Sequence, residues 1–428
     1  MSRTFAATLL LLATPLFAQS LDERVQRELP SLLDTYKALH AAPELSTQEV
    51  KTSAFLAKRL RELGYEVTEN FGKYQDGTTC YGVVAILKNG DGPVVLVRSD
   101  MDGLPVAEQT GLAYASKNAG VMHACGHDVH MTTLLGTAKL LEDLKSQWRG
   151  TVMLIGQPAE EIVKGAQGML DGGLYEKFAR PDYAIALHDW AVLEAGKIGY
   201  RANAFMAATD SLNLVIRGVG GHGAAPHTTK DPVVLAAETV LALQTIVSRE
   251  RPPLEPAVIT VGKIDGGTKR NIIPDEVRLY LTVRTFSPAV RKRILESIQR
   301  VPKGLALAAG IPEDRAPVYE HLPHESVDAT FNDAALTARL ATAIGRELGK
   351  ANVVEIEPAM VSEDFGRFGD GGKIPTVMLA LGAGEATAVA AGTQPGLHSS
   401  KFAPADPSLV LRTGVRAAVS AVVDLLKR

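Results

Sequence analysis

Long apolar runs that end in polar residues constrain the fold of this chain more than any other feature. Their residues are "PVVLVRSD" (93–100), "TVMLIGQPAEE" (151–161), "YAIALHDW" (183–190) and, late in the chain, "PTVMLALG" (375–382). The apolar positions are consecutive rather than alternating, as in strands that are covered on both faces. Residues 129–147 separate two of the runs and place apolar side chains on one helical face. We therefore predict an α/β fold with a mostly parallel sheet and helices on both faces.

Polar residues stand where these predicted strands end. Asp100 ends the first run, Glu160 and Glu161 end the second, and His188 comes near the end of the third; a loop after the last run leads to His398. Ligands of open parallel sheets bind beyond the carboxyl ends of the strands. Neighbouring glutamates suit a hydrolytic metal site, because one can bind metal while the other acts as general base on a water molecule.

The segment "HACGHDVH" (123–130) is a second candidate for metal binding. Cys125 and His127 are two positions apart, so both face one point only if the turn is tight, which Gly126 permits. Taken alone, the segment fits a polar loop with a structural cysteine as well as a metal site. A zinc finger is excluded, because the chain has two cysteines in all.

The pattern changes between residues 205 and 318. Strands are expected near 210–218, 256–264 and 276–286, with helices at 231–250 and 287–310 and a further strand near 316–322. Asp231 is expected to cap the first helix, with Pro232 at its first position. This β-α-β-β-α-β order predicts a ferredoxin-like α+β unit that serves as a lid or dimerisation domain, inserted into a catalytic domain of residues 21–204 and 319–428.

The first twenty residues predict an export signal. Arg3 precedes a short apolar core, "FAATLLLLA", and Ala18 offers a small residue at a cleavage point. The apolar run is too short for a permanent anchor, although a retained helix at the membrane surface is the alternative. We expect an exported protein, periplasmic or extracellular, with no stable membrane anchor after processing. The formal net charge of −3 gives no indication of nucleic-acid binding.

Eight motifs together resemble one family, over nearly the whole mature chain. They are "RSDMDGLPVAE" (98–108), "MHACGHDVHMTTLLG" (122–136), "QPAEE" (157–161), "ALHDW" (186–190), "GGHGAAPH" (220–227), "NIIPDE" (271–276), "SEDF" (362–365) and "LHSSKF" (397–402). The chain resembles the di-metal amidohydrolases and zinc-type exopeptidases, which include aminoacylases, hippurate hydrolase, auxin–amino acid conjugate hydrolases and certain carboxypeptidases. The combination of "CGHD" with "PAEE" is similar to the hippurate and auxin-conjugate branch.

The resemblance implies a role for each matching residue. The implied ligands of two divalent ions per subunit, zinc or manganese before cobalt or nickel, are Cys125, His127, Glu161, His188 and His398. Glu160 would be the general base, and Asp102 would orient a ligating histidine. His222 would polarise the scissile carbonyl, reaching in from a neighbouring subunit in dimeric relatives, and Asn271 would contact the substrate or oxyanion.

The implied activity is hydrolysis of N-acyl amino acids to a carboxylic acid and a free amino acid by metal-activated water. A metallo-exopeptidase acting on short peptides and a non-catalytic ligand-binding protein are the alternatives. A homodimer or higher homo-oligomer would form through the inserted domain. Asp100 departs from the peptidase branch, which has a histidine ligand there, so Asp100 is not expected to bind metal.

The remaining histidines and cysteine receive structural interpretations. His123 and His130 are expected to support the ligands, and His227 to hold its turn, whereas His40, His321 and His324 are expected at the surface. Cys80 is expected as a buried residue of a strand, with a Cys80–Cys125 disulfide as an alternative in the metal-free chain. Asp189 and Trp190 line the pocket or only pack. Arg284 is a candidate for binding a substrate carboxylate, ahead of Lys269 and Arg270.

Overall fold

A computed structural model describes residues 19–427, so the predicted export signal lies outside the described residues except for its last two positions. The largest element of the fold is an eight-stranded sheet. Its strands, in spatial order, are β1 (Glu66–Phe71), β2 (Gly82–Asn89), β4 (Gly150–Gln157), β3 (Val94–Asp100), β5 (Tyr183–Glu194), β16 (Thr376–Gly384), β6 (Ile198–Tyr200) and β15 (Val353–Glu355). The four central strands, β4, β3, β5 and β16, are parallel, and they contain the four apolar runs.

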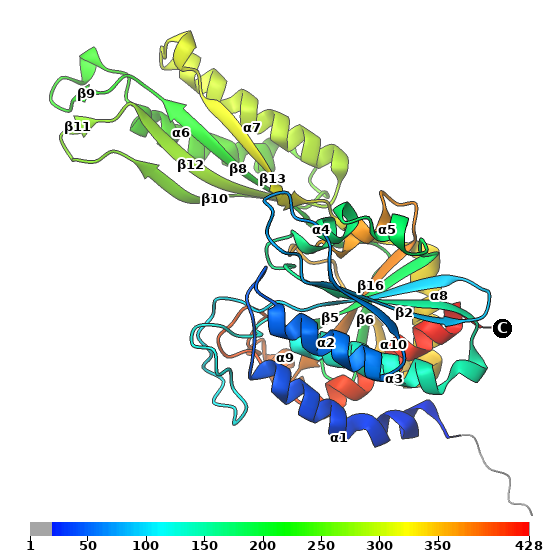
Figure 1. Cartoon of the computed structure of the whole chain (residues 1–428). Helices are drawn as coiled ribbons and strands as arrows, with labels where there is room; N and C mark the ends of the chain where they lie inside the picture. Colours follow the sequence, from blue (N-terminus) through cyan, green and yellow to red (C-terminus); the bar gives the residue numbers. More distant parts are fainter. Residues whose placement is uncertain (1–18, 428) are drawn as a thin grey trace, which may run out of the picture.

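Helices cover both faces of this sheet (Figure 1). One face packs against α1 (Leu21–His40), α2 (Val50–Glu62), α3 (His127–Asp143), α8 (Ala334–Leu348) and α10 (Pro407–Leu425). The other face is covered by the short helices α4 (Gly165–Asp171) and α5 (Leu174–Lys177) and the 3-10 turn η6 (Phe365–Gly369). The predicted fold class, a largely parallel sheet between helices, is therefore confirmed.

A smaller antiparallel sheet projects from the large one (Figure 1). In spatial order it contains β10 (Ala257–Gly266), β12 (Glu276–Thr285), β8 (Ala208–Arg217) and β13 (Val318–Val327), and α6 (Pro232–Thr245) and α7 (Pro288–Ala308) pack on it. The chain order β8-α6-β10-β12-α7-β13 is the predicted ferredoxin-like order. We call this unit the lid. Asp231 caps α6 as predicted, since its carboxylate accepts the N–H of Val233.

The lid sheet continues past residue 318, because β13 pairs with β8 as far as Val327. The short strands β9 (Gly221–His222) and β11 (Ile272–Ile273), which are not consecutive in the chain, pair antiparallel at the outer end of the lid (Figure 1), and we call this two-stranded unit the outer hairpin. The remaining elements are β7 (Asn203–Met206), β14 (Thr330–Asn332), α9 (Ala386–Ala391), the π-helical turn η3 (Ile246–Glu250) and the 3-10 turns η1 (Lys145–Gln147), η2 (Pro226–Thr228), η4 (Glu313–Arg315) and η5 (Lys350–Asn352).

The structure corrects two local expectations. From the sequence, Ser46 or Thr47 is expected to cap a helix that begins at Gln48. In the structure α2 begins at Val50, and the carboxylate of Glu44 accepts the free N–H groups of Lys51 and Thr52. The run that contains His188 also does not end there, because β5 continues beside β16 as far as Glu194. His188 therefore projects from inside a strand.

Two histidines that were expected at the surface are not exposed. His40 is buried between Asp128 and Glu108, and its position on α1 follows Leu32 and Tyr36 at four-residue spacing on the buried face. His321 is half-buried against the carboxylate of Asp210, whereas His324 is exposed as predicted. In both corrected cases a carboxylate on another element binds the ring, which a single histidine in a sequence does not indicate.

Candidate metal centre and active site

The turn before α3 brings Cys125 and His127 to one point. Gly126, between them, has φ +85°, and a Cβ atom there would lie 2.5 Å from the carboxylate of Asp189. Only glycine fits this conformation and this space, so the tight turn that the sequence predicts is present. Both Cys125 and His127 are buried.

The turn after β4 supplies the two glutamates. Ala159 adopts a left-handed conformation with φ +50°, which ends the strand and redirects the chain. Glu160 and Glu161 then both approach the same atom, with carboxylate oxygens 3.9 and 3.8 Å from His127 Nε2. Successive residues of a regular strand would point to opposite faces, so the bend is what makes the pair converge.

His188 and His398 reach the same place from other parts of the chain. His188 Nδ1 donates to the carbonyl of its neighbour Asp189 at 2.9 Å, which leaves the Nε2 lone pair facing Cys125 Sγ at 3.6 Å. His398 has φ +65°, and its N–H binds the carbonyl of Ala124 at 2.8 Å. Its Nε2 lies 3.3 Å from Glu161. All five residues predicted to bind metal are thus brought together.

Asp102 lies behind His127, where its predicted role requires it. Its Oδ1 is 3.3 Å from His127 Nδ1, and its Oδ2 accepts the Ser46 hydroxyl at 2.6 Å and the Glu161 N–H at 3.1 Å. A carboxylate at Nδ1 favours the tautomer with its proton there and directs the Nε2 lone pair into the centre. Asp102 therefore links the orientation of His127 to the position of Glu161.

His130 and Asp100 are occupied by other partners. The N–H of Asp189 donates to His130 Nε2 at 2.7 Å, so His130 Nδ1 carries the proton and donates to Asp100 at 2.6 Å. The second oxygen of Asp100 binds Arg98 at 2.6 Å. Because these ring nitrogens and carboxylate oxygens are already bonded, we place both residues outside the ligand set, although they lie close to His127 and His188.

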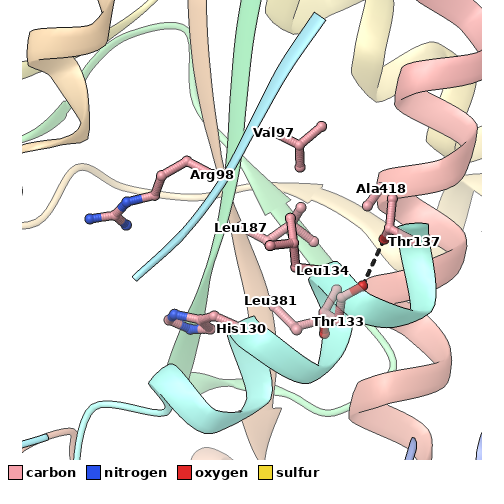
Figure 2. Close-up of a pocket in the computed structure, with 9 residues that line it drawn as sticks. All are labelled: Val97, Arg98, His130, Thr133, Leu134, Thr137, Leu187, Leu381 and Ala418. Carbon is pink, nitrogen blue, oxygen red and sulfur yellow. Dashed lines mark hydrogen bonds between the residues drawn. The ribbon is translucent and has the colours of Figure 1, made fainter. Parts of the chain in front are cut away.

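Arg98 is a central residue of this region to which the sequence assigned no role. It is fully buried and binds Glu363 at 2.7 Å and Gln157 at 2.9 Å as well as Asp100. Figure 2 shows Arg98 and Val97 on opposite sides of β3. The small cavity drawn in this figure, beside β3 and α3, is lined mainly by apolar side chains. Arg98 belongs to the "RSD" motif and Glu363 to the "SEDF" motif. The two residues are 265 positions apart, so no local sequence pattern connects them.

Buried negative charge exceeds buried positive charge at the centre. Burial raises the pKa of Glu160 well above its usual range, and the charges of Glu363 and Glu161 raise it further. Burial also raises the pKa of the Cys125 thiol, again with Glu161 and Glu160 adding to the effect. In His127 the carboxylates of Asp100 and Asp102 outweigh burial and raise the pKa to about 10. Such a site stabilises an added cation.

The donors fit divalent metal ions. Ligand atoms of Cys125, His127 and Glu161 lie within 4.8 Å of one another. The buried atoms His127 Nε2 and Glu161 Oε1 have no hydrogen-bond partner among the described residues. Buried polar atoms are normally paired, so unpaired ligand atoms that converge on one point indicate a site for a cation, which would replace the proton on His127 Nε2. Sulfur, imidazole and carboxylate together suit zinc, manganese, cobalt or nickel.

His222 and Asn271 are not part of this cluster. They are neighbours on the outer hairpin, where the N–H of Gly223 binds the Asn271 carbonyl at 2.9 Å. The His222 side chain is exposed, and Figure 1 shows the hairpin at the far end of the lid from the large sheet. In a single chain, these two predicted residues stand apart from the metal ligands.

The other candidates fall into three groups. His123 is buried beside the ligands, and burial lowers its pKa to about 4, which keeps it neutral. Asp189 is buried, and Trp190 packs against Phe205 with ring centroids 5.5 Å apart. Lys269 and Arg270 are exposed, as is His227.

The two cysteines are free in the structure, so the alternative of a Cys80–Cys125 disulfide is not present. Cys80 is buried, as predicted, but precedes β2 rather than lying in a strand. Arg284 on β12 binds the Met360 carbonyl and the Ser362 hydroxyl, each at 2.9 Å. Its guanidinium has no carboxylate partner among the described residues, which leaves it available to an acidic ligand.

The chain is similar to known proteins in both sequence and structure. Residues 96–412 match the model of peptidase family M20/M25/M40. The chain is 38% identical over 335 residues to N-acetyl-L-cysteine deacetylase of Bacillus subtilis, which covers 78% of this chain and 76% of the relative. It is 39% identical over 336 residues to hippurate hydrolase of Campylobacter jejuni, which covers 77% and 82%. A crystal structure of a dinuclear metal-binding peptidase of the M20 family from Bacillus subtilis superimposes with a TM-score of 0.76 and 30% identity, covering 94% of this chain and 99% of that one.

Proposed function

We propose a function for this chain from one premise: it belongs to peptidase family M20/M25/M40 and is a hydrolase of that family. The proposal is that it cleaves the amide bond of N-acyl amino acids, releasing a carboxylic acid and a free amino acid. The observation that carries it is the convergence of five metal donors with Glu160, whose carboxylate lies 3.9 Å from His127 Nε2. The names of the relatives support N-acyl amino acids as the substrate class.

The metal ions would be held by Cys125, His127, Glu161, His188 and His398, with Cys125 binding as the thiolate. Two divalent ions would lower the pKa of a water molecule and polarise the substrate carbonyl. Zinc and manganese come first by ligand type, with cobalt and nickel as alternatives.

Glu160 would move the proton during the reaction. As its carboxylate takes a proton from water, the water oxygen forms a bond to the amide carbon; the C–N bond then breaks as Glu160 returns that proton to the nitrogen. Asp102 would hold His127 in the tautomer that keeps Nε2 toward the centre.

His222 and Asn271 would complete the site from a second copy of the chain. The lid supports such a homodimer by two features: β10 is an edge strand of its sheet, and α6 next to it exposes Val233, Val234 and Leu241. Within residues 19–427, Pro232–Glu250 is also apolar and long enough to cross a membrane, but its buried side packs on the lid sheet. A self-complementary interface across a two-fold axis would cover both features.

Two further parts of the proposal concern substrate and location. Arg284 would bind the carboxylate of the amino acid, because its guanidinium has only neutral acceptors within reach in the described structure.

Export of the protein is proposed from the sequence of residues 1–20. The N-terminal sequence of the protein recovered from a cell envelope fraction would test it, since an intact Met1 there contradicts cleavage.

A substrate panel tests the proposed function. The mature protein would be stripped of metal, refilled separately with zinc, manganese, cobalt or nickel, and assayed for amine release from N-acetyl amino acids, N-benzoyl amino acids and dipeptides. Metal-dependent release that favours acyl amino acids supports the proposal. Release from dipeptides alone supports the exopeptidase alternative, and no release despite tight metal binding supports the non-catalytic one.

A further inference from the structure

The loop between α1 and α2, residues 41–49, reaches the turn that carries the two active-site glutamates. Glu49 is fully buried at the end of this loop. Its Oε1 accepts the N–H of Thr47 at 3.0 Å and, 110 residues away in the sequence, the N–H of Ala159 at 2.8 Å. Ala159 immediately precedes Glu160.

The Ala159 N–H binds this turn directly to the loop between α1 and α2. Within the turn, the Ala159 carbonyl accepts the N–H groups of Lys164 and Gly165, and the Glu160 carbonyl accepts the N–H of Val163. Ala159 has φ +50°, a conformation that residues other than glycine adopt only when their surroundings hold them there. The hydrogen bond from the Ala159 N–H to Glu49, a residue outside the turn, stabilises this conformation.

A second contact from the same loop acts on the other side of Glu160. Ser46 donates to Asp102 at 2.6 Å, and the same oxygen of Asp102 accepts the N–H of Glu161 at 3.1 Å. The loop therefore fixes the backbone N–H groups on both sides of Glu160, one directly through Glu49 and one through Asp102. It contributes no atom to the metal cluster itself.

We propose that Glu49 is a positioning residue, which binds the Ala159 N–H and thereby holds Glu160 and Glu161 in the geometry that amide hydrolysis requires. The inference rests on the proposed function, because it assigns Glu49 to the step that Glu160 performs. Reactive groups displaced by about 1 Å lose about a hundredfold in rate. Loss of the contact should therefore reduce turnover more than substrate affinity.

Three variants separate positioning from general stability. Glu49→Met removes the acceptor but keeps the volume, whereas Glu49→Gln keeps an oxygen that can accept both N–H groups. Glu44→Met is the matched control, because Glu44 belongs to the same loop and caps α2 without contacting the turn. We expect Glu49→Met to lower kcat by about ten- to a hundredfold with little change in KM. Glu49→Gln should stay near the wild type, and Glu44→Met should lower thermal stability but not kcat.

Hydrogen exchange of the peptide that covers residues 157–164 gives a readout that does not depend on activity. Exchange at Ala159 should be faster in Glu49→Met and unchanged in Glu49→Gln and Glu44→Met. If the wild type hydrolyses none of the amides, the proposed function fails, and the exchange result alone decides the positioning of the turn. If Glu49→Met does not fold, Glu49→Asp replaces it, because its shorter side chain keeps the carboxyl group but does not reach the Ala159 N–H. Unchanged exchange, wild-type kcat, or an equal loss of kcat in Glu44→Met would overturn the inference.

Discussion

The metal cluster and the outer hairpin of the lid carry the predicted site residues in opposite settings. Cys125, His127 and His188 are buried, and each lies against another element of the large sheet or its adjoining turns. His222, in β9, and Asn271, just before β11, are exposed where these two short strands pair at the far end of the lid (Figure 1). The fold of one chain brings the residues of the metal cluster together, but it does not bring His222 and Asn271 to that cluster.

This difference indicates which part of the activity each region can supply. The cluster has the proposed metal donors and an excess of buried acidic groups, so one chain should bind metal by itself. Stabilising the oxyanion needs a group that faces the substrate carbonyl, and the hairpin reaches a site only in another copy or after a large lid movement. Metal binding and turnover should therefore respond to different substitutions.

The largest effect is expected from Glu160→Gln, on the cluster side of the comparison. Glutamine keeps the shape but cannot take the proton from water, so kcat should fall by roughly a hundred- to ten-thousandfold. Metal content, measured by mass spectrometry of the purified variant, should match the wild type, because Glu161 and not Glu160 is the proposed ligand. Loss of metal in this variant, or near-normal turnover, would contradict the assignment.

His222→Ala tests the lid side and should have a somewhat smaller effect. Removing one group that stabilises an oxyanion costs about a hundred- to a thousandfold in kcat. KM should change less, and metal content should not change at all, since the hairpin is remote from the donors. His227→Ala is a matched control, because His227 is exposed on the 3-10 turn η2, five residues after His222, and has no proposed contact with substrate. An effect on KM alone would argue against transition-state stabilisation.

The smallest effect concerns stability rather than turnover, and it comes from a buried histidine outside the site. Burial disfavours a charged His40, but hydrogen bonds to Asp128 and Glu108 raise its pKa to about 9. Because this pKa lies above the unfolded value of about 6.5, the interaction of charged His40 with its two carboxylates stabilises the fold fully at pH values below 6.5. The contribution, about 3 kcal/mol by this shift, is then lost as the pH rises through 9.

Urea unfolding of the wild type and His40→Gln across this pH range would measure it. The difference in free energy of unfolding should be largest near pH 6.5 and should shrink toward pH 9 and above. His324→Gln, which changes an exposed histidine of the lid, should show no such trend. A difference that is constant with pH would mean that His40 stabilises the fold by packing and not by its charge.

Sequence patterns predicted the framework and the tight turn at Cys125 and His127 because both rest on local features, whereas the full set of five metal ligands came from the resemblance to a family. Consecutive apolar residues indicated the central parallel strands, and Gly126 between Cys125 and His127 indicated a turn that only glycine fits. Contacts between distant residues were not predictable in this way. Arg98 meets Glu363 across 265 positions and Glu49 meets Ala159 across 110, and neither contact leaves a periodic signal.

His40 is an instructive intermediate case. Its spacing from Leu32 and Tyr36 places it on the buried face of α1, so helical periodicity could have corrected the expectation that it lies at the surface. The partners that keep its ring charged, Asp128 and Glu108, lie 88 and 68 positions away. Periodicity thus predicts burial, while the energetics of that burial depend on the tertiary fold.

Mixing two inactive variants tests the central claim most directly, that the buried cluster of one chain works with His222 of another. Glu160→Gln and His222→Ala would be co-expressed with different tags, and the mixed dimer purified through both. Because each two-fold dimer then holds one site with both residues intact, about half of the wild-type activity should return. Mixed dimers that form but show no activity above that of the parent variants would contradict the claim and place His222 in the site of its own chain or outside catalysis.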